Sequence, residues 1–154
     1  STDFIQLEGF SATLINMGLN GMMVTSYILI VGGQLNGPTL GGIFAVIGFG
    51  AYGKHLKNII PIMIGIIIGS LVKVWSINDP SILLASLFGT ALAPIAGTYG
   101  WFFGILAGLL HSSVVLHIGQ LHAGLNLYNN GFSAGIVASI LVPLIEAFKR
   151  HISK

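Results

Sequence analysis

Long runs of apolar residues, separated by short polar clusters, dominate the pattern of this chain. Two intervals contain no charged residue: residues 9–53, a run of 45, and residues 80–145, a run of 66. A helix needs about 20 apolar residues to cross the roughly 30 Å hydrocarbon core of a bilayer. The first interval fits two crossings, the second about three, and the apolar run between Lys57 and Asp79 adds one. The pattern predicts an all-α, polytopic integral membrane bundle of five or six transmembrane helices.

Turn formers place the ends of these spans, because Gly, Pro, Asn and Asp favour turns or cannot continue a helix. The predicted spans are residues 10–31, 39–53, 58–77, 82–97, 99–118 and 132–148. The second span has only fifteen residues, which rise about 22 Å as an α-helix. The stretch 119–131 is too polar for a lipid-facing helix. We therefore expect broken or re-entrant elements, which leave both five and six crossings open.

Composition supports the same class and excludes others. Only 6% of the 154 residues are charged and 54% are hydrophobic, whereas soluble domains carry about 25% charged residues. The net charge of +2 forms no basic face, so nucleic acid is excluded as a partner. We treat residues 1–154 as a single transmembrane domain. The chain begins at Ser1 rather than Met, and we expect it to be processed, trimmed or a fragment.

Basic residues predict the orientation, because loops rich in Lys and Arg stay cytoplasmic. Lys54 and Lys57 follow the second span, and Lys149 and Arg150 close the last one. Six crossings place both clusters on the same side, while five require one re-entrant element. We expect the Lys54/Lys57 loop and the C-terminus to be cytoplasmic, and the lipid bilayer to be the surroundings of the spans.

Small residues recur every four positions on several spans. The fifth span carries Gly100, Gly104, Gly108 and Ser112, and similar stripes lie on the third, fourth and last spans. In a bilayer, small residues let helix backbones approach closely. The stripes predict either helix packing within one chain or an interface with a homologous half or a second copy of the chain.

Asn-Gly pairs are the first group of candidate functional residues: Asn20-Gly21, Asn36-Gly37 and Asn130-Gly131. Inside a membrane, an interrupted helix leaves backbone groups that must face protein or water. We interpret the first and last pairs as discontinuous helices that meet near the midplane, as at many transporter sites. The alternative is that Asn36 and Asn130 only cap helices at the interface. Asn126 and Asn129 add further amides before the last pair.

Two further groups of polar residues interrupt apolar runs. Thr90 and Pro94 share the fourth span, where Pro94 removes a backbone donor; this predicts either an ordinary kink or one wall of a pore. His111 lies in the fifth span, and His122 follows it. Ionisable residues inside a membrane are functional candidates, and a hydrogen-bonded packing role is the alternative for His111.

Motifs for enzymatic chemistry are absent from the sequence. His111, His117 and His122 are six and five residues apart, which places neighbours on different helix faces, and no His-Glu-x-x-His motif occurs. No combination of nucleophile, base and orienting residue can be assembled. With no Cys either, we predict no enzyme, no metal site and no cofactor.

Several motifs carry a resemblance to a known family. They are Gly18-Leu19-Asn20-Gly21-Met22-Met23, the run from Gln34 to Ile43, Gly50-Ala51-Tyr52-Gly53-Lys54-His55 and the run from Leu121 to Phe132. The chain resembles a bacterial multi-pass membrane family of unknown function, domain of unknown function 1576. This resemblance implies a bacterial inner-membrane location. It also implies two copies of the domain in a full-length protein, of which this chain is the C-terminal half.

A second similarity is to the urea-transporter group, which carries a Tyr-Asn-Gly-aliphatic stretch at a broken element. Leu19-Asn20-Gly21-Met22 and Asn129-Asn130-Gly131-Phe132 are similar to it, whereas the Leu-x-x-Pro-x-x-Thr pattern of that group is distorted in residues 87–98. The similarity implies a neutral solute.

We therefore predict a membrane channel or transporter component for a small polar, uncharged solute. The residues expected to line its path are Asn20, Gly21, Asn36, Gly37, Thr90, Pro94, His111, His122, Asn126, Asn129 and Asn130. The alternative is an accessory or assembly subunit without transport activity, which would dock a partner through its glycine stripes.

Overall fold

The computed structural model of the protein describes residues 4–73, 75–118 and 126–152. Every secondary-structure element in these residues is helical, which confirms the all-α class. The helices are α1 (Phe4–Glu8), α2 (Phe10–Ile30), α3 (Gly37–Phe49), η1 (Gly50–Tyr52), α4 (Leu56–Val72), α5 (Pro80–Phe88), η2 (Gly89–Leu92), α6 (Ala93–Tyr99), α7 (Trp101–Val115) and α8 (Asn126–Ile152).

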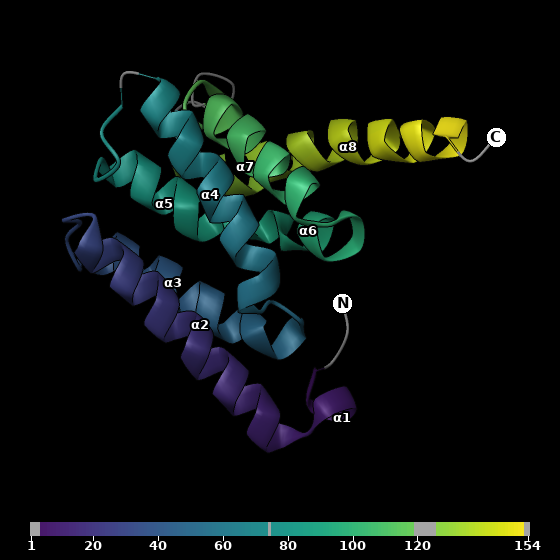
Figure 1. The fold of residues 1–154 in the computed structure, drawn as a ribbon. Coiled ribbons are helices and arrows are strands. Elements are labelled where there is room, and N and C mark those ends of the chain that lie inside the picture. The colour runs from purple at the N-terminus through teal and green to yellow at the C-terminus, as the bar shows by residue number, and fades with distance from the viewer. Residues whose placement is uncertain (1–3, 74, 119–125, 153–154) are drawn as a thin grey trace.

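The chain passes back and forth between two ends of the molecule (Figure 1). The connection α2–α3 lies at one end, and the connections α3–α4 and α6–α7 lie toward the other. In the described part of the chain, three segments are long and apolar enough to cross a bilayer: Phe10–Ile30, Pro80–Tyr99 and Asn129–His151. Three shorter apolar helices, Gly37–Tyr52, Leu56–Val72 and Trp101–Val115, lie between them in the chain, so the six predicted spans correspond to six observed segments.

The predicted helix breaks are not where the Asn-Gly pairs lie. Helix α2 continues through Asn20-Gly21, and α8 continues through Asn130-Gly131, so both predicted discontinuities are wrong. A Gly inside a helix costs only about 1 kcal/mol relative to Ala and keeps its backbone hydrogen bond. An Asn-Gly pair therefore does not interrupt a helix whose other residues favour it.

The interruption lies in the fourth span instead. There the 3₁₀ segment η2 separates α5 from α6, and Pro94 occupies the first turn of α6, where its missing N–H removes no helical hydrogen bond. The third span also ends at Val72 rather than at residue 77.

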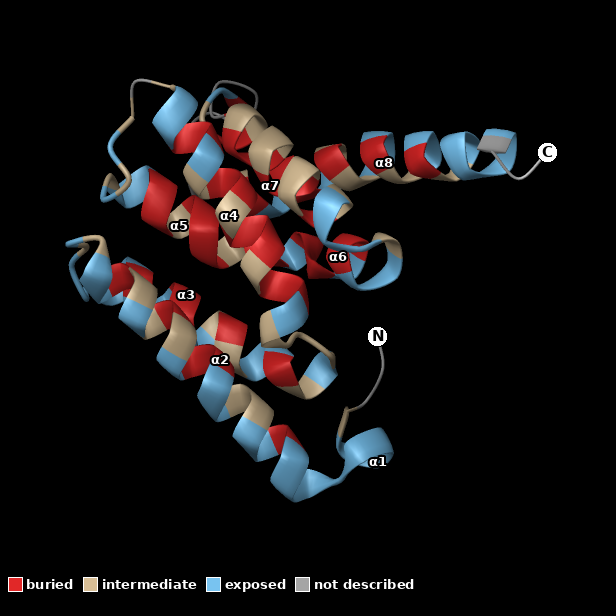
Figure 2. Cartoon of the chain, viewed as in Figure 1, coloured by how far each residue is buried: buried red, intermediate tan, exposed pale blue. Residues whose placement is uncertain are grey.

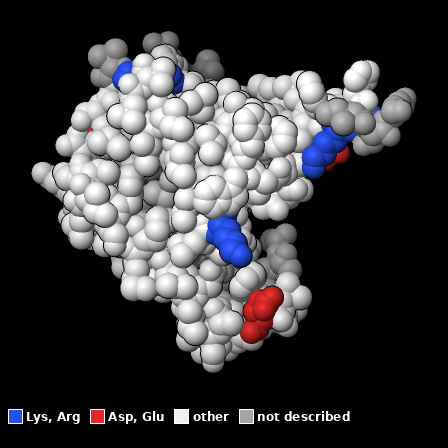
Figure 3. Space-filling view, in the orientation of Figure 1, with Lys and Arg blue, Asp and Glu red and all other residues white. Residues whose placement is uncertain are grey.

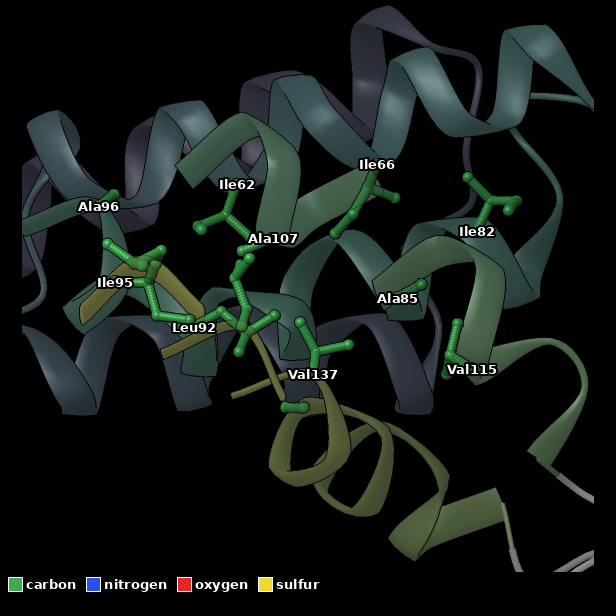
Figure 4. Packing of buried hydrophobic residues seen from close by; sticks show 13 residues of the cluster. Ile62, Ile66, Ile82, Ala85, Leu92, Ile95, Ala96, Ala107, Val115 and Val137 are labelled. Carbon is green, nitrogen blue, oxygen red and sulfur yellow. The ribbon is translucent and has the colours of Figure 1, made fainter. Parts of the chain in front are cut away.

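Helix α4 lies at the centre of the molecule and separates two apolar clusters. One cluster joins α4 to α5, η2, α6, α7 and α8, and Figure 4 shows Ile62 and Ile66 of α4 pointing toward Leu92, Ala107 and Val137. The other joins α2 and α3 to α4 and α5. Figure 2 shows the consequence: α4 and α5 are largely buried, while α2 and α8 each expose one face.

Glycines allow α4 and α7 to pack backbone against backbone. A Cβ on Gly65 would collide with the carbonyl oxygen of Ile105, and a Cβ on Gly108 would collide with that of Ile62. The Gly104 position is likewise closed, by Ala96 and Pro61. The stripe on α7 therefore packs within one chain. We call this contact the α4–α7 seam.

The equivalent stripe on α8 is open. A Cβ added at Gly131 or Gly135 would meet no atom of another described element within 4 Å, and Ser139 of the same face is exposed. Helix α8 also extends beyond the other helices at its C-terminal end (Figure 1). There the Tyr99 hydroxyl donates to the Glu146 carboxylate at 2.6 Å and fixes α8 to the end of α6.

Candidate functional site

Most buried polar side chains in the described residues are satisfied locally. The hydroxyls of Thr13, Ser70 and Ser112 each donate to a carbonyl three or four residues earlier in the same chain segment. Such bonds to the preceding helical turn are common for Ser and Thr inside helices. They need no other partner, and they indicate packing rather than a binding site.

A second set of polar side chains lies between α2, the α3–α4 loop, η2, α7 and α8, and its members contact residues of other segments or leave atoms without partners. Bonds between helices elsewhere, such as Tyr27 to Ser86, are not part of this set. We call this set the polar row. It consists of Asn16, Asn20, Lys54, Thr90, His111, Asn130 and Ser133.

The row begins where α2 holds the loop that joins α3 to α4. The side-chain amide of Asn16 donates to the Gly50 and Lys54 carbonyls at 2.9 and 2.7 Å, and the amide of Asn20 donates to the Lys54 carbonyl at 2.9 Å. Gly50 lies so close to α2 that a Cβ would meet Met17 and the Asn20 amide at 3.0–3.2 Å. Gly53 then turns the chain with a φ of +95°, which favours Gly.

This anchorage places the Lys54 side chain against the interrupted span. The ammonium Nζ donates to Thr90 Oγ1 at 3.0 Å and lies 4.7 Å from the centre of the Phe49 ring. Thr90 donates its own hydroxyl proton to the Leu87 carbonyl at 2.6 Å, so its oxygen is free to accept from Lys54. Burial lowers the pKa of Lys54 from 10.5 to about 8, since desolvation disfavours the charged amine.

The row continues on the other side of η2. Gly89 precedes Thr90 and leaves room for the His111 ring, because a Cβ there would lie 2.8 Å from His111 Cδ2. His111 Nε2 is 3.3 Å from Asn130 Oδ1. Since a carboxamide oxygen only accepts, this pairing assigns the imidazole proton to Nε2 and leaves Nδ1 as an acceptor. Ser133 follows Asn130 by one turn on the buried face of α8.

Three atoms of the row are buried and have no hydrogen-bond partner among the described residues: Asn20 Oδ1, His111 Nδ1 and Ser133 Oγ. A buried donor or acceptor without a partner costs about 1–3 kcal/mol, and such groups are rare enough in folded proteins to require an explanation. Two of the orphaned atoms are acceptors, and the Ser133 hydroxyl can donate or accept. A small molecule with both kinds of group is chemically matched to them.

The structure brings some of the predicted site residues together and separates others. Asn20, Thr90, His111 and Asn130 all belong to the polar row, and Gly21 is buried beside Ile47. Asn129 donates to the Val115 carbonyl at 2.8 Å. His122 lies outside the described residues, and of Asn126 only the helical backbone is described.

Asn36 and Gly37 are exposed at the start of α3 and do not belong to the row. The Asn36 side chain accepts from the Thr39 backbone N–H at 3.1 Å, and the Thr39 hydroxyl accepts from the Asn36 N–H at 2.8 Å. These two bonds form a capping box, as expected from the alternative that Asn36 only caps a helix. That Asn36 and Gly37 line a solute path stays a prediction.

Three members of the row, Asn16, Lys54 and Ser133, are not among the site residues expected from the sequence. A usable signal exists for Lys54. The second span is too short to cross a bilayer and is followed by Gly50 and Gly53. The loop after it, which holds Lys54, should therefore lie beside the first span rather than level with its end. No comparable signal marks Ser133, because its burial depends on the rotation of α8.

Histidines do not gather into a metal-binding cluster in the part of the chain that the structure describes. His117 Nδ1 is 2.8 Å from the Ser113 carbonyl, and its ring packs edge-on against Trp75. These contacts account for His117 without a ligand.

Comparison with known proteins places the chain in a family. No curated protein and no solved structure matched it. A family model described as "Protein of unknown function (DUF1576)" matches residues 1–147, which is nearly the whole chain. With this match added to the motifs around Asn20 and Lys54, the chain belongs to the DUF1576 family.

Proposed function

We propose that this protein is a membrane channel or transporter component for a small polar solute. The observation that carries the proposal is the polar row, with its three buried atoms that lack partners in the described structure. In a bilayer such groups cannot be satisfied by solvent. A polar solute that passes along the row supplies the missing hydrogen bonds while it is bound.

The surface of the molecule supports a location within a membrane. Large apolar side chains are exposed along both outer helices; they include Leu14, Ile15, Met22 and Leu29 of α2, and Ile140, Leu144 and Phe148 of α8. Figure 3 shows that charged residues are few on this face and are separated by broad uncharged surface. Exposed apolar surface on this scale requires an apolar environment or a partner. We place the protein in a bacterial inner membrane, with the α3–α4 loop and the C-terminus toward the cytoplasm.

The interrupted span gives the row its position in the bundle. Thr90 lies ten residues after Pro80 and nine before Tyr99, so η2 lies near the middle of this membrane-length segment. Transporter sites are commonly built where a helix is discontinuous near the bilayer midplane. Here a single interruption contacts polar residues of the α3–α4 loop and of α7, and the row extends from them to α2 and α8.

Solute flux into proteoliposomes tests the proposal. We expect the wild-type protein to raise the entry rate of at least one small polar solute above that of empty vesicles, and an Asn20→Leu, Asn130→Leu double variant to abolish the increase. Asn36→Leu is the matched control, because Asn36 is an exposed cap outside the row. Equal flux in the wild type and the double variant would remove these residues from the path, and no flux in any protein would refute the function.

A second candidate function, an accessory or assembly subunit, is favoured by the open stripe on α8. Gly131, Gly135 and Ser139 form a small-residue face without a packing partner among the described residues, and such faces let another helix approach closely. A homologous half or a second copy would fit it. Replacing Gly135 with Trp should then reduce crosslinking between chains, whereas the same change at Gly104 should disrupt the chain itself.

A further inference from the structure

The buried hydrogen-bonding capacity that the polar row leaves unused belongs mainly to acceptors. Asn20 Oδ1 and His111 Nδ1 are fully buried acceptors without a partner among the described residues. The donors beside them are in use. Both amide protons of Asn16 go to carbonyls between α3 and α4, the Thr90 hydroxyl proton goes to a carbonyl of its own span, and the imidazole proton goes to Asn130. A molecule that satisfies the two acceptors must therefore bring N–H or O–H groups.

The third orphaned atom fits the same requirement. Ser133 Oγ is fully buried, and a hydroxyl accepts as well as donates. Asn20, His111 and Ser133 come from three helices, α2, α7 and α8, so the unused acceptors are distributed along the row. A molecule that moves along the row needs donors at each of these positions.

Lys54 adds a positive charge to the row. Its carbonyl accepts from Asn20, ten residues from each end of α2, and its ammonium donates to Thr90 in the interrupted span. Burial lowers the pKa of Lys54 to about 8, which leaves the amine mostly protonated at pH 7. Ionisable side chains at such a depth generally belong to a solute or ion path.

No carboxylate among the described residues compensates this charge. Glu8 is exposed on α1, Asp79 caps α5, and Glu146 accepts from Tyr99. Inside a bundle of low dielectric constant, a cation that enters the row meets an uncompensated like charge. Positive side chains exclude cations in this way from other membrane pathways.

The same charge does not make the row an anion site. An anion such as nitrate has no N–H or O–H group, so it leaves Asn20 Oδ1 and His111 Nδ1 unsatisfied. A neutral molecule with N–H groups satisfies both. A carbonyl oxygen on the same molecule can accept from the Lys54 protons that Thr90 does not use. A small primary amide combines these groups.

From these contacts we propose that the polar row selects small neutral amides, of the size of urea or acetamide, and that Lys54 is the residue that excludes cations of the same shape. The inference rests on the proposed transport function and names its substrate class. The sequence led us to expect an uncharged solute because the predicted path lacked a charge. The path instead contains Lys54, so neutrality follows from two filters: the acceptors reject anions, and the ammonium rejects cations.

Urea and guanidinium are a matched pair for the role of Lys54, because both are planar, similar in size and rich in N–H groups, and only guanidinium is charged. Their entry into phosphatidylcholine vesicles is compared at zero membrane potential, set with potassium and valinomycin. The wild type should admit urea faster than empty vesicles do and should not admit guanidinium. In Lys54→Met the ratio of guanidinium to urea entry should rise about tenfold or more, because the like charge is gone.

Two further variants separate charge from packing. Lys54→Arg retains the charge and should keep the ratio as low as in the wild type. Lys57→Met removes a charge that is exposed three residues away and should behave like the wild type. Guanidinium entry through the wild type, or the same ratio in the wild type and Lys54→Met, would overturn the role of Lys54. A raised ratio in Lys54→Arg would assign the effect to packing and overturn it as well.

Acetamide and acetone test the requirement for donors, since a methyl group in acetone replaces the NH₂ group of acetamide at nearly the same shape. Acetamide in excess should slow the entry of labelled urea, and acetone at the same concentration should not. An equal effect of both, or no effect of either, would show that the N–H groups are not recognised and would overturn the amide inference.

Glycerol separates failure of this inference from failure of the proposed function. Glycerol entry without urea entry would overturn the amide class and leave transport standing. Entry of none of urea, glycerol and guanidinium would refute the transport function itself, and the amide inference with it.

Discussion

The α4–α7 seam and the polar row cross the same bundle and are built in opposite ways. In the seam, Gly65 and Gly108 let the two backbones touch at these two positions. In the row, polar side chains meet between helices and leave three buried atoms unpaired in the described structure. Close packing favours one rigid arrangement, whereas unpaired polar groups reduce stability. The difference indicates that the seam fixes the fold and that the row is kept for another reason.

The two regions also meet at neighbouring residues of one helix. His111 of the row follows Gly108 of the seam by three residues, and Ser112 closes the seam against Gly69. The rigid contact therefore positions the imidazole beside η2 and Asn130. Mutations in the seam should therefore mainly change stability, whereas mutations in the row should mainly change solute flux.

The largest effect is expected in the seam. Gly65→Ala adds a Cβ that collides with the Ile105 carbonyl, and a backbone atom cannot move away unless α7 moves. We expect a loss of about 3 kcal/mol or more, at the upper end of overpacking costs, measured by reversible unfolding in detergent. Gly135→Ala is the control: its Cβ meets nothing within 4 Å among the described residues, and it should gain up to about 1 kcal/mol. Equal effects of the two changes would contradict the seam.

The next effect is a pH dependence that belongs to the row. The pKa of Lys54 is lowered from 10.5 to about 8 in the folded protein, so between these values the unfolded chain binds more protons than the folded one. Stability should therefore rise as the pH increases from about 8 to about 10.5, by on the order of 1–3 kcal/mol. The rise should be absent in Lys54→Met. Lys57→Met should retain it, and a loss of the rise in both variants would assign it to the loop as a whole.

A smaller effect is expected at the α3 cap, which belongs to neither region. Asn36→Ala removes the acceptor for the Thr39 backbone N–H and should cost about 1 kcal/mol, as for other N-caps. Solute flux per folded molecule should not change. A loss of flux without a loss of stability would instead place Asn36 in the solute path.

The smallest effect on stability is expected at Ser133. Its hydroxyl is buried without a partner among the described residues, so Ser133→Ala removes an unsatisfied group and should change stability by less than about 1 kcal/mol, in the stabilising direction. Flux should nevertheless fall, because the row loses a donor. Thermal melting and vesicle entry on the same preparation check both parts. A clearly destabilised variant would show that the hydroxyl has a structural partner.

Parts of the candidate site could be predicted from sequence because they depend on local pattern. Asn20, Thr90, His111 and Asn130 are polar residues inside or beside apolar runs, and burial follows when the run itself is a helix in a bundle. The helix breaks could not be predicted in the same way. Helix α2 continues through Asn20-Gly21 because its other residues favour a helix, and the Asn20 amide donates to the Lys54 carbonyl, 34 residues away.

The sequence by itself determined the all-helical class, the six apolar segments and the scarcity of charge, because each follows from the length and polarity of local stretches. Tertiary structure decided which glycine stripe became a seam: the stripes on α7 and α8 look alike in sequence, yet only the first meets another backbone in the described part of the chain. It also decided that the amine of Lys54 reaches Thr90. The physical reason is that contacts between distant residues depend on how the helices rotate against one another, which local periodicity does not encode.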